Sequence, residues 1–312
     1  MAPPEADVAG LAAQLGVPCV LKPVSLSGGT GVIRADTPAE AAEVAERIRA
    51  ILVGHGHPRD EPLLLERFVP GDEVALEGLL RRGALDVLAL FDKPDPLDGP
   101  YFEETIYVTP SRLPADHQNA VVQVVEAACS ALGLREGPIH AEVRLARAER
   151  HQGRDRGQGE PVDVRLLEVA ARSIGGLCSK LLRFGTRMSL EELILRHALG
   201  LDLDHARRSG RAAGVMMLPI PRSGVLADVR GVDAAAALEG ITGIEITATL
   251  GRPITALPEG GRYLGFVFAE SDTPAGVEAA LRMAHSLLDV VIADNAAPAP
   301  HRPRLRTVVE PR

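Results

Sequence analysis

The feature that most constrains the fold is a pair of apolar segments that each carry one glutamate. Glu142 lies within residues 137–145 (GPIHAEVRL) and Glu168 within residues 164–172 (VRLLEVAAR), on either side of a polar, Gly- and Arg-rich stretch. Both segments have the composition of buried strands, in which an unpaired carboxylate is costly. If the strands pair antiparallel about a loop centred near Asp155, Glu142 falls opposite Glu168, since each lies thirteen residues from the centre.

Two facing carboxylates repel each other unless a cation lies between them. Mg²⁺ takes one or two protein carboxylates together with substrate phosphates, which is what this pair offers. The pattern is consistent with a metal site between Glu142 and Glu168. The alternative is two unrelated glutamates at strand edges that face solvent, and the spacing alone leaves both interpretations open.

A glycine-rich segment near the start of the chain joins two further strands. Residues 18–23 (PCVLKP) have a buried-strand pattern that includes Lys22, residues 25–31 (SLSGGTG) follow, and Val32 and Ile33 continue extended. No Gly-Lys-Ser/Thr follows the glycines, so this is not a Walker A loop, and it opens no helix as a dinucleotide-binding loop does. A Gly/Ser hairpin can lay backbone N–H groups over phosphate oxygens, and Lys22 would meet the phosphates as a point charge. An ordinary hairpin turn is the alternative.

The remaining patterns predict an α+β fold. Thr37 and Glu40 form a capping box with Pro38 at the first helical position. The apolar periodicity predicts a helix over 116–132 and strands over these ranges: 63–69, 73–80, 84–91, 139–145 and 162–169. After about residue 211 the pattern changes to short strands over 213–220, 224–229, 241–249 and 263–269, followed by a helix capped by Thr273 and Pro274. We interpret this part as a small α+β lobe packed on the main one.

Composition excludes several classes of partner. Aromatic residues make up 3% of the chain, with no Trp, so the core must be aliphatic and base stacking is disfavoured. The net charge is −8 and no Lys/Arg run exists, which argues against a nucleic-acid partner. No apolar run approaches the roughly 20 residues that span a bilayer, and no secretory signal follows Met1. Three widely spaced cysteines fit a reducing compartment, so we expect a cytoplasmic protein without membrane partners.

The ordered set of motifs resembles a known family. A strand lysine, a glycine loop, LLLERFVPGDE at 63–73, HAE at 140–142 and E-x-x-x-R at 168–172 are similar to the ATP-grasp superfamily, in its L-amino-acid ligase and biotin-carboxylase-like branch. The resemblance covers residues 17 to about 195 well. It implies the ATP-grasp fold, in which two α+β lobes grip ATP. The domains would be a small lobe over 1–69 with a truncated start, a large lobe with the metal site over 70–210, and a ligase-type α+β lobe over 211–292; the Pro/Ala/Arg-rich residues 293–312 are expected to be a disordered tail.

The resemblance implies two groups of ATP contacts. The residues expected around the phosphates and ribose are Lys22 and, in the closing loop, Ser27, Gly28 and Gly29, with Glu73 on the ribose hydroxyls. The segment expected to grip adenine consists of Glu66, Arg67, Phe68 and Val69. Within it, Glu66 would accept from the exocyclic amine, and backbone groups of Phe68 or Val69 would read the ring.

The same resemblance implies the metal and substrate residues. Glu142 and Glu168 would be Mg²⁺ ligands, with Mn²⁺ as an alternative ion, and Arg172 would be catalytic by steadying an acyl phosphate. Arginine suits such charge stabilisation, although Arg172 alone is equally consistent with a surface arginine. Lys93 and Glu104 match positions that face substrate or nucleotide, and His140 shares a strand face with Glu142. A packed strand histidine is the alternative for His140.

Two departures from the family pattern bear on function. Ala170 stands where the family commonly has an Asn that ligates metal, so the metal would rely on Glu142, Glu168, phosphates and water. The usual N-terminal Rossmann-like domain is also missing ahead of the first strand. We therefore expect an ATP- and Mg-dependent ligase that joins a small-molecule carboxylate to an amine through an acyl phosphate, with amino-acid or dipeptide formation as one form of this reaction. The alternatives are a non-catalytic ATP-binding fragment or subunit that pairs with a separately encoded Rossmann-like domain, and a biotin-carboxylase-like enzyme; a homodimer stays open.

Overall fold

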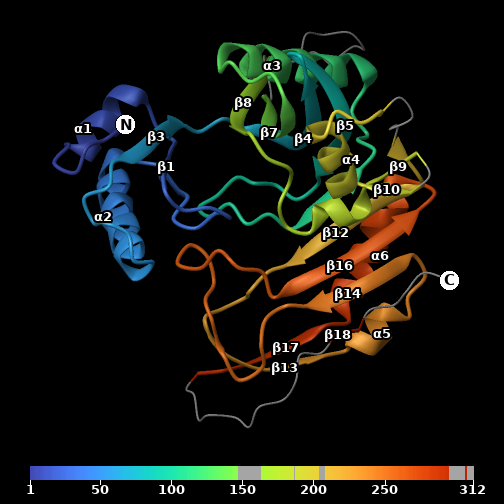
Figure 1. The fold of residues 1–312 in the computed structure, drawn as a ribbon. Coiled ribbons are helices and arrows are strands. Elements are labelled where there is room, and N and C mark those ends of the chain that lie inside the picture. The colour runs from blue at the N-terminus through green and yellow to red at the C-terminus, as the bar shows by residue number, and fades with distance from the viewer. Residues whose placement is uncertain (147–162, 186, 204–207, 295–305, 308–312) are drawn as a thin grey trace, which may run out of the picture.

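The computed structural model describes residues 1–146, 163–185, 187–203, 208–294 and 306–307 (Figure 1). The polar loop centred near Asp155 and most of the expected tail lie outside the described residues. Within the described part, no helix is both long and apolar enough to cross a membrane. Cys19, Cys129 and Cys178 are buried free thiols.

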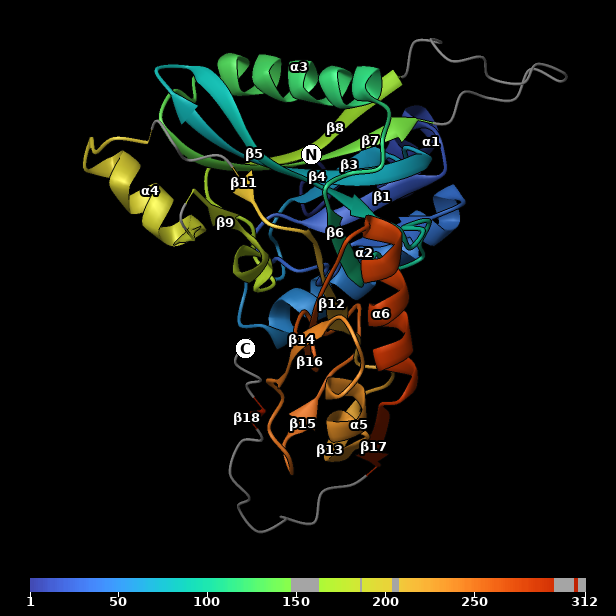
Figure 2. The ribbon, with the colours of Figure 1, turned by 90° about the vertical axis from the view of Figure 1, so that its right-hand side faces the viewer.

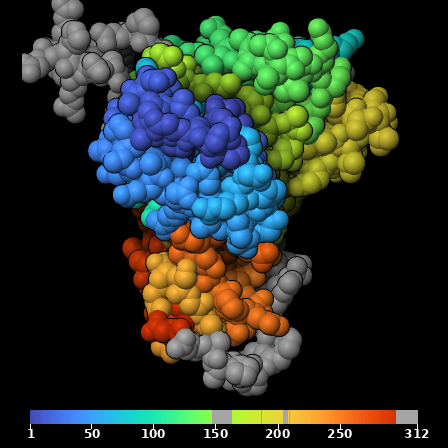
Figure 3. Space-filling model, turned by 90° about the vertical axis from the view of Figure 1, so that its left-hand side faces the viewer, coloured from blue at the N-terminus to red at the C-terminus, as the bar shows by residue number. Residues whose placement is uncertain are grey.

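The N-terminal layer is a three-stranded antiparallel sheet with two helices on it. The strands are β1 (Cys19–Pro23), β2 (Ile33–Ala35) and β3 (Leu63–Arg67), in the order β2-β1-β3. Helices α1 (Val8–Leu15) and α2 (Pro38–Gly54) share an aliphatic core with the sheet. The glycine-rich segment joins β1 to β2, as the sequence predicts. Figure 3 shows this blue layer covering one side of the molecule, with green residues above it and orange residues below.

Helix α2 begins where the capping box predicts. The Thr37 hydroxyl accepts a hydrogen bond from the Glu40 N–H at 3.1 Å. The Glu40 carboxylate in turn accepts from the Asp36 N–H at 2.8 Å. The first bond satisfies a backbone donor that the first helical turn leaves free, and the second holds the residue before the cap.

A nine-stranded sheet forms the centre of the molecule, in the order β18-β14-β16-β12-β6-β5-β4-β7-β8. Its first five strands along the chain are β4 (Gly71–Arg81), β5 (Ala84–Lys93), β6 (Ile106–Thr109), β7 (Gly137–Ala146) and β8 (Asp163–Ala170). Helix α3 (Ala115–Ala131) lies across one face, as Figure 2 shows. Its apolar side packs against residues of β4, β5 and β7.

The alternation along β4 decides what faces the other side of this sheet. Val74 and Leu76 belong to the core under α3, whereas Ala75 and Leu79 belong to the core on the opposite face. Side chains two apart in a strand share a face. Glu73 and Glu77 therefore lie on the face away from α3.

The segment after β8 forms short elements beside the opposite face. These are a 3-10 helix η1 (Cys178–Leu181), helix α4 (Leu190–Ala198), and a small sheet of β9 (Arg183–Phe184), β10 (Met188–Ser189) and β11 (Arg208–Ser209). The Ser189 hydroxyl caps α4 by accepting from the Glu192 N–H at 3.1 Å. The cap satisfies one of the backbone donors that the first turn of the helix leaves free.

The C-terminal strands continue the central sheet. The elements are β12 (Ala212–Leu218), β13 (Gly224–Arg230), α5 (Val232–Ala236), β14 (Ile241–Ile246), β15 (Pro253–Ile254), β16 (Gly265–Ser271), α6 (Pro274–Ser286), β17 (Asp289–Ala293) and β18 (Arg306–Thr307). Strand β12 pairs antiparallel with β6, with Ala213 opposite Thr109 and Met216 opposite Ile106. The C-terminal part expected from residue 211 thus shares one sheet with the strands that carry Glu142 and Glu168. Strands β13, β15 and β17 form a separate sheet, and β18, inside the expected tail, pairs with β14.

Candidate active site

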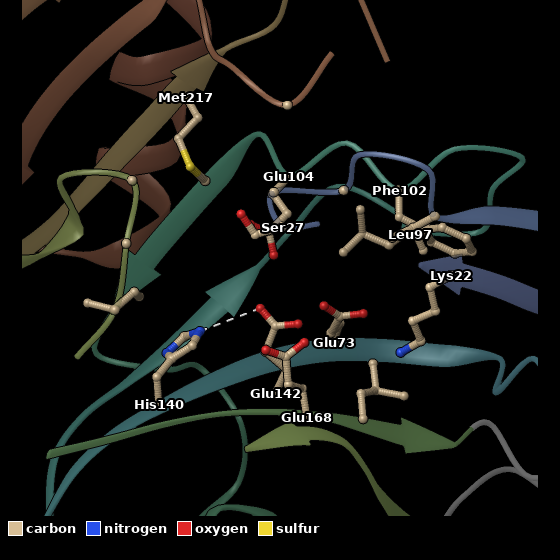
Figure 4. A pocket seen from close by; sticks show the side chains of 18 of the residues that line it. Lys22, Ser27, Glu73, Leu97, Phe102, Glu104, His140, Glu142, Glu168 and Met217 are labelled. Carbon is tan, nitrogen blue, oxygen red and sulfur yellow. Dashed lines mark ion pairs between the residues drawn. The ribbon is translucent and has the colours of Figure 1, made fainter. Parts of the chain in front are cut away.

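A pocket of about 720 Å³ lies between the N-terminal layer and the central sheet. Figure 4 shows part of its lining. Fourteen of the fifteen predicted site residues line it: Lys22, Ser27, Gly28, Gly29, Glu66, Arg67, Phe68, Val69, Glu73, Glu104, His140, Glu142, Glu168 and Arg172. The fifteenth, Lys93, lies buried directly behind the wall, where it contacts three of them.

One end of the pocket is formed by the hinge segment, residues 66–69. Lys22 on β1 forms an ion pair with Glu66 on the neighbouring strand β3. In the register of the two strands, Glu66 lies opposite Val20. The Phe68 N–H donates to the Pro18 carbonyl at 3.0 Å. Phe68 and Phe102 lie with ring centroids 6.4 Å apart, so this end offers flat apolar surface beside a lysine.

Arg144 holds the hinge segment in place, and the sequence analysis missed it. Its guanidinium is buried and donates to the Val69 carbonyl at 2.6 Å, the Leu97 carbonyl at 2.5 Å and the Glu73 carboxylate at 2.8 Å. A planar fork of donors can hold several acceptors in one geometry. The sequence did contain a signal for Arg144. It lies two residues after Glu142 on β7, and side chains two apart in a strand share a face.

The glycine hairpin, residues 25–31, closes one side of the pocket. Gly28 and Gly29 have φ of 64° and 76°, a left-handed conformation that glycine adopts without strain. A Cβ on Gly28 would lie 3.0 Å from the Gly261 carbonyl oxygen, so the hairpin also needs glycine for close approach. The Gly31 N–H donates to the Pro258 carbonyl at 2.9 Å, which ties the hairpin to the C-terminal part of the chain.

Lys93 lies at the centre of an acid cluster formed by Glu73, Glu104 and Glu142. Its Nζ lies 2.6 Å from both Glu73 and Glu104 and 2.9 Å from Glu142. Burial alone would lower the pKa of Lys93, but the surrounding carboxylates raise it well above its ordinary value. The carboxylate oxygens lie within 4.8 Å of one another, close enough to share a cation, and the ammonium fills that role.

Glu142 and Glu168 face each other across β7 and β8, which confirms the predicted register. A bulge follows the pair, since Val143 next pairs with Leu166. Burial would raise the pKa of Glu142, but the Lys93 ammonium and His140 hold it well below its ordinary value. Glu168 is exposed to the pocket, and Figure 4 shows its carboxylate beside that of Glu142.

The sequence analysis also missed Glu77, which connects two parts of the site. Its side chain has no exposed surface, and its carboxylate accepts from the Ile174 N–H at 3.0 and 3.2 Å. His140 lies between Glu77 and Glu142, at 3.5 Å from each carboxylate. Burial lowers the pKa of His140, but the two carboxylates outweigh it and raise the pKa to about 9.

Arg172 lies in the loop that Glu77 anchors. The loop follows β8, and the Arg172 guanidinium donates to the neighbouring Ser173 carbonyl at 2.9 Å. The residue is exposed to the pocket. A long cationic side chain beside Glu168 is placed to meet an anionic group of a ligand.

The end of the pocket beyond the acid cluster is apolar. We call it the apolar wall; it consists of Cys178, Met217, Tyr263 and Phe266. In Figure 4, Met217 lies on the opposite side of Glu104 from Phe102, Leu97 and Lys22. Three of the four wall residues come from the C-terminal part of the chain, where sequence motifs gave no sign of a site.

Geometry and motifs together define a class of protein. The ATP-grasp domain matches residues 15–180, more than half of the sequence, and the chain belongs to the ATP-grasp family. Its C-terminal part, residues 216–293, matches the L-amino acid ligase C-terminal domain 2.

Individual proteins show the same relationship. Alanine–anticapsin ligase of Bacillus subtilis is 29% identical over 178 residues, 52% of this chain and 34% of that protein. The crystal structure of an L-amino acid ligase from Bacillus licheniformis superposes with a TM-score of 0.71 at 27% identity, over 90% of this chain and 66% of that one. Biotin carboxylase of Campylobacter jejuni, at 14% identity and a TM-score of 0.60 over 92% and 60% of the two chains, shares the fold. These matches confirm the α+β ATP-grasp fold.

The chain spans about half the length or less of the curated relatives it matches.

Proposed function

We propose that this chain binds Mg-ATP in the pocket and acts as a ligase that joins a carboxylate to an amine. The observation that carries the proposal is the facing pair of Glu142 and Glu168 opposite Lys22 and the glycine hairpin. ATP would enter with its base at the hinge segment and its phosphates toward the acid cluster. The lobes would be residues 1–69, 70–210 and 211–292.

The free hydrogen-bonding groups of the hinge segment suit adenine. The Phe68 N–H and the Val69 carbonyl are already engaged by Pro18 and Arg144. The groups that would hydrogen-bond the adenine ring are therefore the Phe68 carbonyl, an acceptor, and the Val69 N–H, a donor on the next residue. Lys22 would exchange its partner Glu66 for a phosphate oxygen, which frees the Glu66 carboxylate for the exocyclic amine.

The carboxylate pair fits a divalent cation. Glu142 uses one oxygen on Lys93, which leaves its other oxygen and the Glu168 carboxylate toward the pocket. Glu142 and Glu168 would hold Mg²⁺ or Mn²⁺, which neutralises the charge of the nucleotide phosphates. Ala170 pairs with His140 and offers no donor atom, so phosphate and water oxygens would complete the shell.

The chain's own side chains would position the reaction. A substrate carboxylate oxygen attacks the γ-phosphorus and ADP leaves, which gives an acyl phosphate. The amine nitrogen then attacks the acyl carbon, loses a proton, and phosphate leaves. Arg172 would stabilise the transferring phosphoryl group, and the glycine hairpin would exclude water from it.

Glu168→Gln tests the proposal. It keeps the shape of the side chain but removes its charge, so we expect ADP release in the presence of paired amino acids to fall roughly 100-fold or more. Nucleotide binding without divalent cation should be unchanged in a calorimetric titration. Asp163→Asn, on the same strand but paired with Arg165 outside the pocket, is the matched control. Full turnover by Glu168→Gln would disprove the metal assignment.

A second candidate function is nucleotide binding without catalysis. The observation that favours it is Ala170, which supplies no third protein ligand near the carboxylate pair. This candidate predicts ATP affinity that depends on Mg²⁺ but no ADP release with any carboxylate and amine. The same titration and turnover assay therefore distinguish the two functions.

A further inference from the structure

Lys93 belongs to a row of charged residues that crosses three neighbouring strands. In the register of the sheet it lies opposite Glu73 on β4, and Glu73 lies opposite Arg144 on β7. One oxygen of the Glu73 carboxylate accepts from the Lys93 ammonium at 2.6 Å, and the other accepts from the Arg144 guanidinium at 2.8 Å. The Glu73 side chain is 7% exposed. Both of its oxygens therefore have cationic partners within the chain.

The Lys93 ammonium has three carboxylate partners, one for each of its N–H donors. Nζ donates to Glu73 and Glu104 at 2.6 Å and to Glu142 at 2.9 Å. The Tyr107 ring centroid lies 4.9 Å from Nζ, so an aromatic face also meets the cation. The Lys93 side chain is 3% exposed, and the cavity directly behind it has no room for a water molecule. A hydrated divalent ion could not share this space with the ammonium.

The bond to Lys93 fixes the orientation of Glu142. Oε1 of Glu142 lies 2.9 Å from Nζ and 3.5 Å from the His140 ring, so both neighbours lie on the same oxygen. The other oxygen is left to the pocket, where Figure 4 shows the Glu168 carboxylate beside that of Glu142. Because two further carboxylates hold Lys93, Glu142 cannot rotate away without breaking a bond of a buried cation, which is costly.

We propose that Lys93 is a positioning residue that acts as a built-in cation. It holds Glu142 in the orientation from which Glu142 and Glu168 bind a single divalent ion, and it closes the acid cluster to a second ion. The inference rests on the proposed function, which assigns the ion to this pair. Ala170, on the same strand as Glu168, adds no donor atom for a further ion. Beside the pair, the positive charge is supplied by the chain itself.

Lys93→Met separates a built-in cation from ordinary structural support. Methionine has nearly the length of lysine but no charge, so the three carboxylates would converge on an uncharged position, with oxygens within 4.8 Å of one another. Carboxylate oxygens in such an arrangement bind divalent ions. The variant should therefore gain an ion while it loses the correct placement of Glu142. Lys180→Met breaks an ion pair with Glu245 and does not alter the pocket lining, so it is the matched control.

Mn²⁺ serves as the probe, titrated into each protein with ADP present and counted by EPR and equilibrium dialysis. We expect one tightly bound Mn²⁺ per chain in the wild type and in Lys180→Met, and two in Lys93→Met. In Lys93→Met, kcat for ADP release with paired amino acids should fall roughly 10–100-fold, as is usual when a group that orients a metal ligand is lost. A gain of metal together with a loss of turnover is not what a merely destabilised protein would show.

Thermal unfolding keeps the test informative if Lys93→Met is unstable. Loss of the ammonium leaves buried carboxylates without their counter-ion, so without metal this variant should melt below the wild type. Because an ion that binds only the folded chain stabilises it, Mn²⁺ should raise the melting temperature of Lys93→Met more than that of the wild type or Lys180→Met. If Lys93→Met does not fold even with Mn²⁺, the wild-type count decides: one ion supports the inference and two overturn it.

Two Mn²⁺ or none in the wild type, no additional ion in a folded Lys93→Met, or full turnover by that variant would overturn the inference. A gain of one ion in Lys93→Met, with no ADP release by any of the proteins, supports the built-in cation and removes the ligase function. ADP release that depends on Glu168, with equal ion counts in the wild type and Lys93→Met, keeps the ligase function and removes the built-in cation.

Discussion

Glu77 shows how one buried carboxylate can serve two parts of a site. Burial raises its pKa, while His140 and the Ile174 N–H both favour its charged form. Glu77 is not itself among the residues that line the pocket, and it reaches the site through His140 and Ile174, which are. We interpret it as a positioning residue that holds His140 and the Arg172 loop in place.

Glu77→Ala should therefore affect both stability and turnover. Loss of the acceptor leaves the buried Ile174 N–H without its partner and removes one of the two carboxylates beside the His140 imidazole, and we expect the free energy of unfolding to fall by about 2–4 kcal/mol. Chemical denaturation measures this change. Asp86→Ala is the control, because it breaks an exposed ion pair with Arg81 on the same sheet and should cost less than about 1 kcal/mol.

A second variant separates positioning from structural support. Glu77→Gln keeps an acceptor for the Ile174 N–H, so kcat for ADP release should recover toward the wild-type value more than with alanine. KM for ATP should stay close to wild type in both variants, because the hinge segment is remote from Glu77. Equal loss of kcat in the glutamine and alanine variants would refute this role.

Sequence alone predicts the site to different extents for different residues. Glu142 opposite Glu168 was predictable, because strands that are neighbours in the sequence pair about a short connection and period-2 alternation fixes the face. The bond between Glu77 and Ile174 was not, because 97 residues separate them. Lys93 could be assigned to the site, but not its contacts with three carboxylates on other segments.

At the scale of elements, the glycine hairpin depends on an acidic residue outside the site. The Glu61 carboxylate accepts from the N–H groups of Val24 at 2.9 Å and Ser25 at 3.0 Å, where the chain leaves β1. Burial raises the pKa of Glu61, but the hydrogen bonds from Ser25 and Val24 together outweigh it and lower the pKa. Glu61 thus anchors the base of the hairpin.

The lowered pKa fixes the sign of a pH dependence. Because the folded pKa of Glu61 lies below its ordinary value of 4.5, its stabilisation is present above pH 4.5 and is lost as the pH falls through the folded pKa. An NMR titration of the Glu61 side chain should give a midpoint below 4.5, the ordinary pKa of a glutamate. In Glu61→Gln, amide exchange at Val24 and Ser25 should be faster at neutral pH and less sensitive to acid. A midpoint at or above 4.5 would contradict this anchor.

Local capping signals explain which helices could be predicted from the sequence. Helices α2, α4 and α6 begin at the capping residues that the sequence shows, because a cap is a local signal. Helices α1 and α5 and strand β17 were missed. They are short, and α5 begins after Gly231 without a side-chain cap, so neither periodicity nor capping marks it.

At the scale of the whole molecule, three contacts join the N-terminal layer to residues 258–259. The Gly31 N–H donates to Pro258, the His55 ring lies 2.8 Å from the Glu259 carbonyl, and Arg47 pairs with the Glu259 carboxylate at 2.6 Å. The glycine hairpin is thus held by two parts of the molecule that lie far apart in the sequence. The pairing of β6 with β12 likewise joins segments that lie far apart in the sequence, and no sequence pattern indicated it.

Removal of residues 212–312 should therefore disrupt the protein rather than release a stable ATP-binding part. The deletion leaves β6, whose four residues are all buried, as a bare edge, and it exposes the core that Val215 and Phe268 complete. Exposed apolar edges promote aggregation. We expect the truncated chain to be insoluble or to elute as aggregates in size-exclusion chromatography. A soluble monomer that binds ATP would show that the N-terminal parts are independent.

The unbroken sheet also limits how such chains can be recombined. A crossover between relatives at residue 211 would unite a β6 and a β12 that were never selected to fit, and would bring a foreign apolar wall to the pocket. A chimera should fold better if the exchanged segment begins before Ile106, the first residue of β6, because β6 and β12 then come from the same relative. Specificity and foldability are then inherited as a single unit.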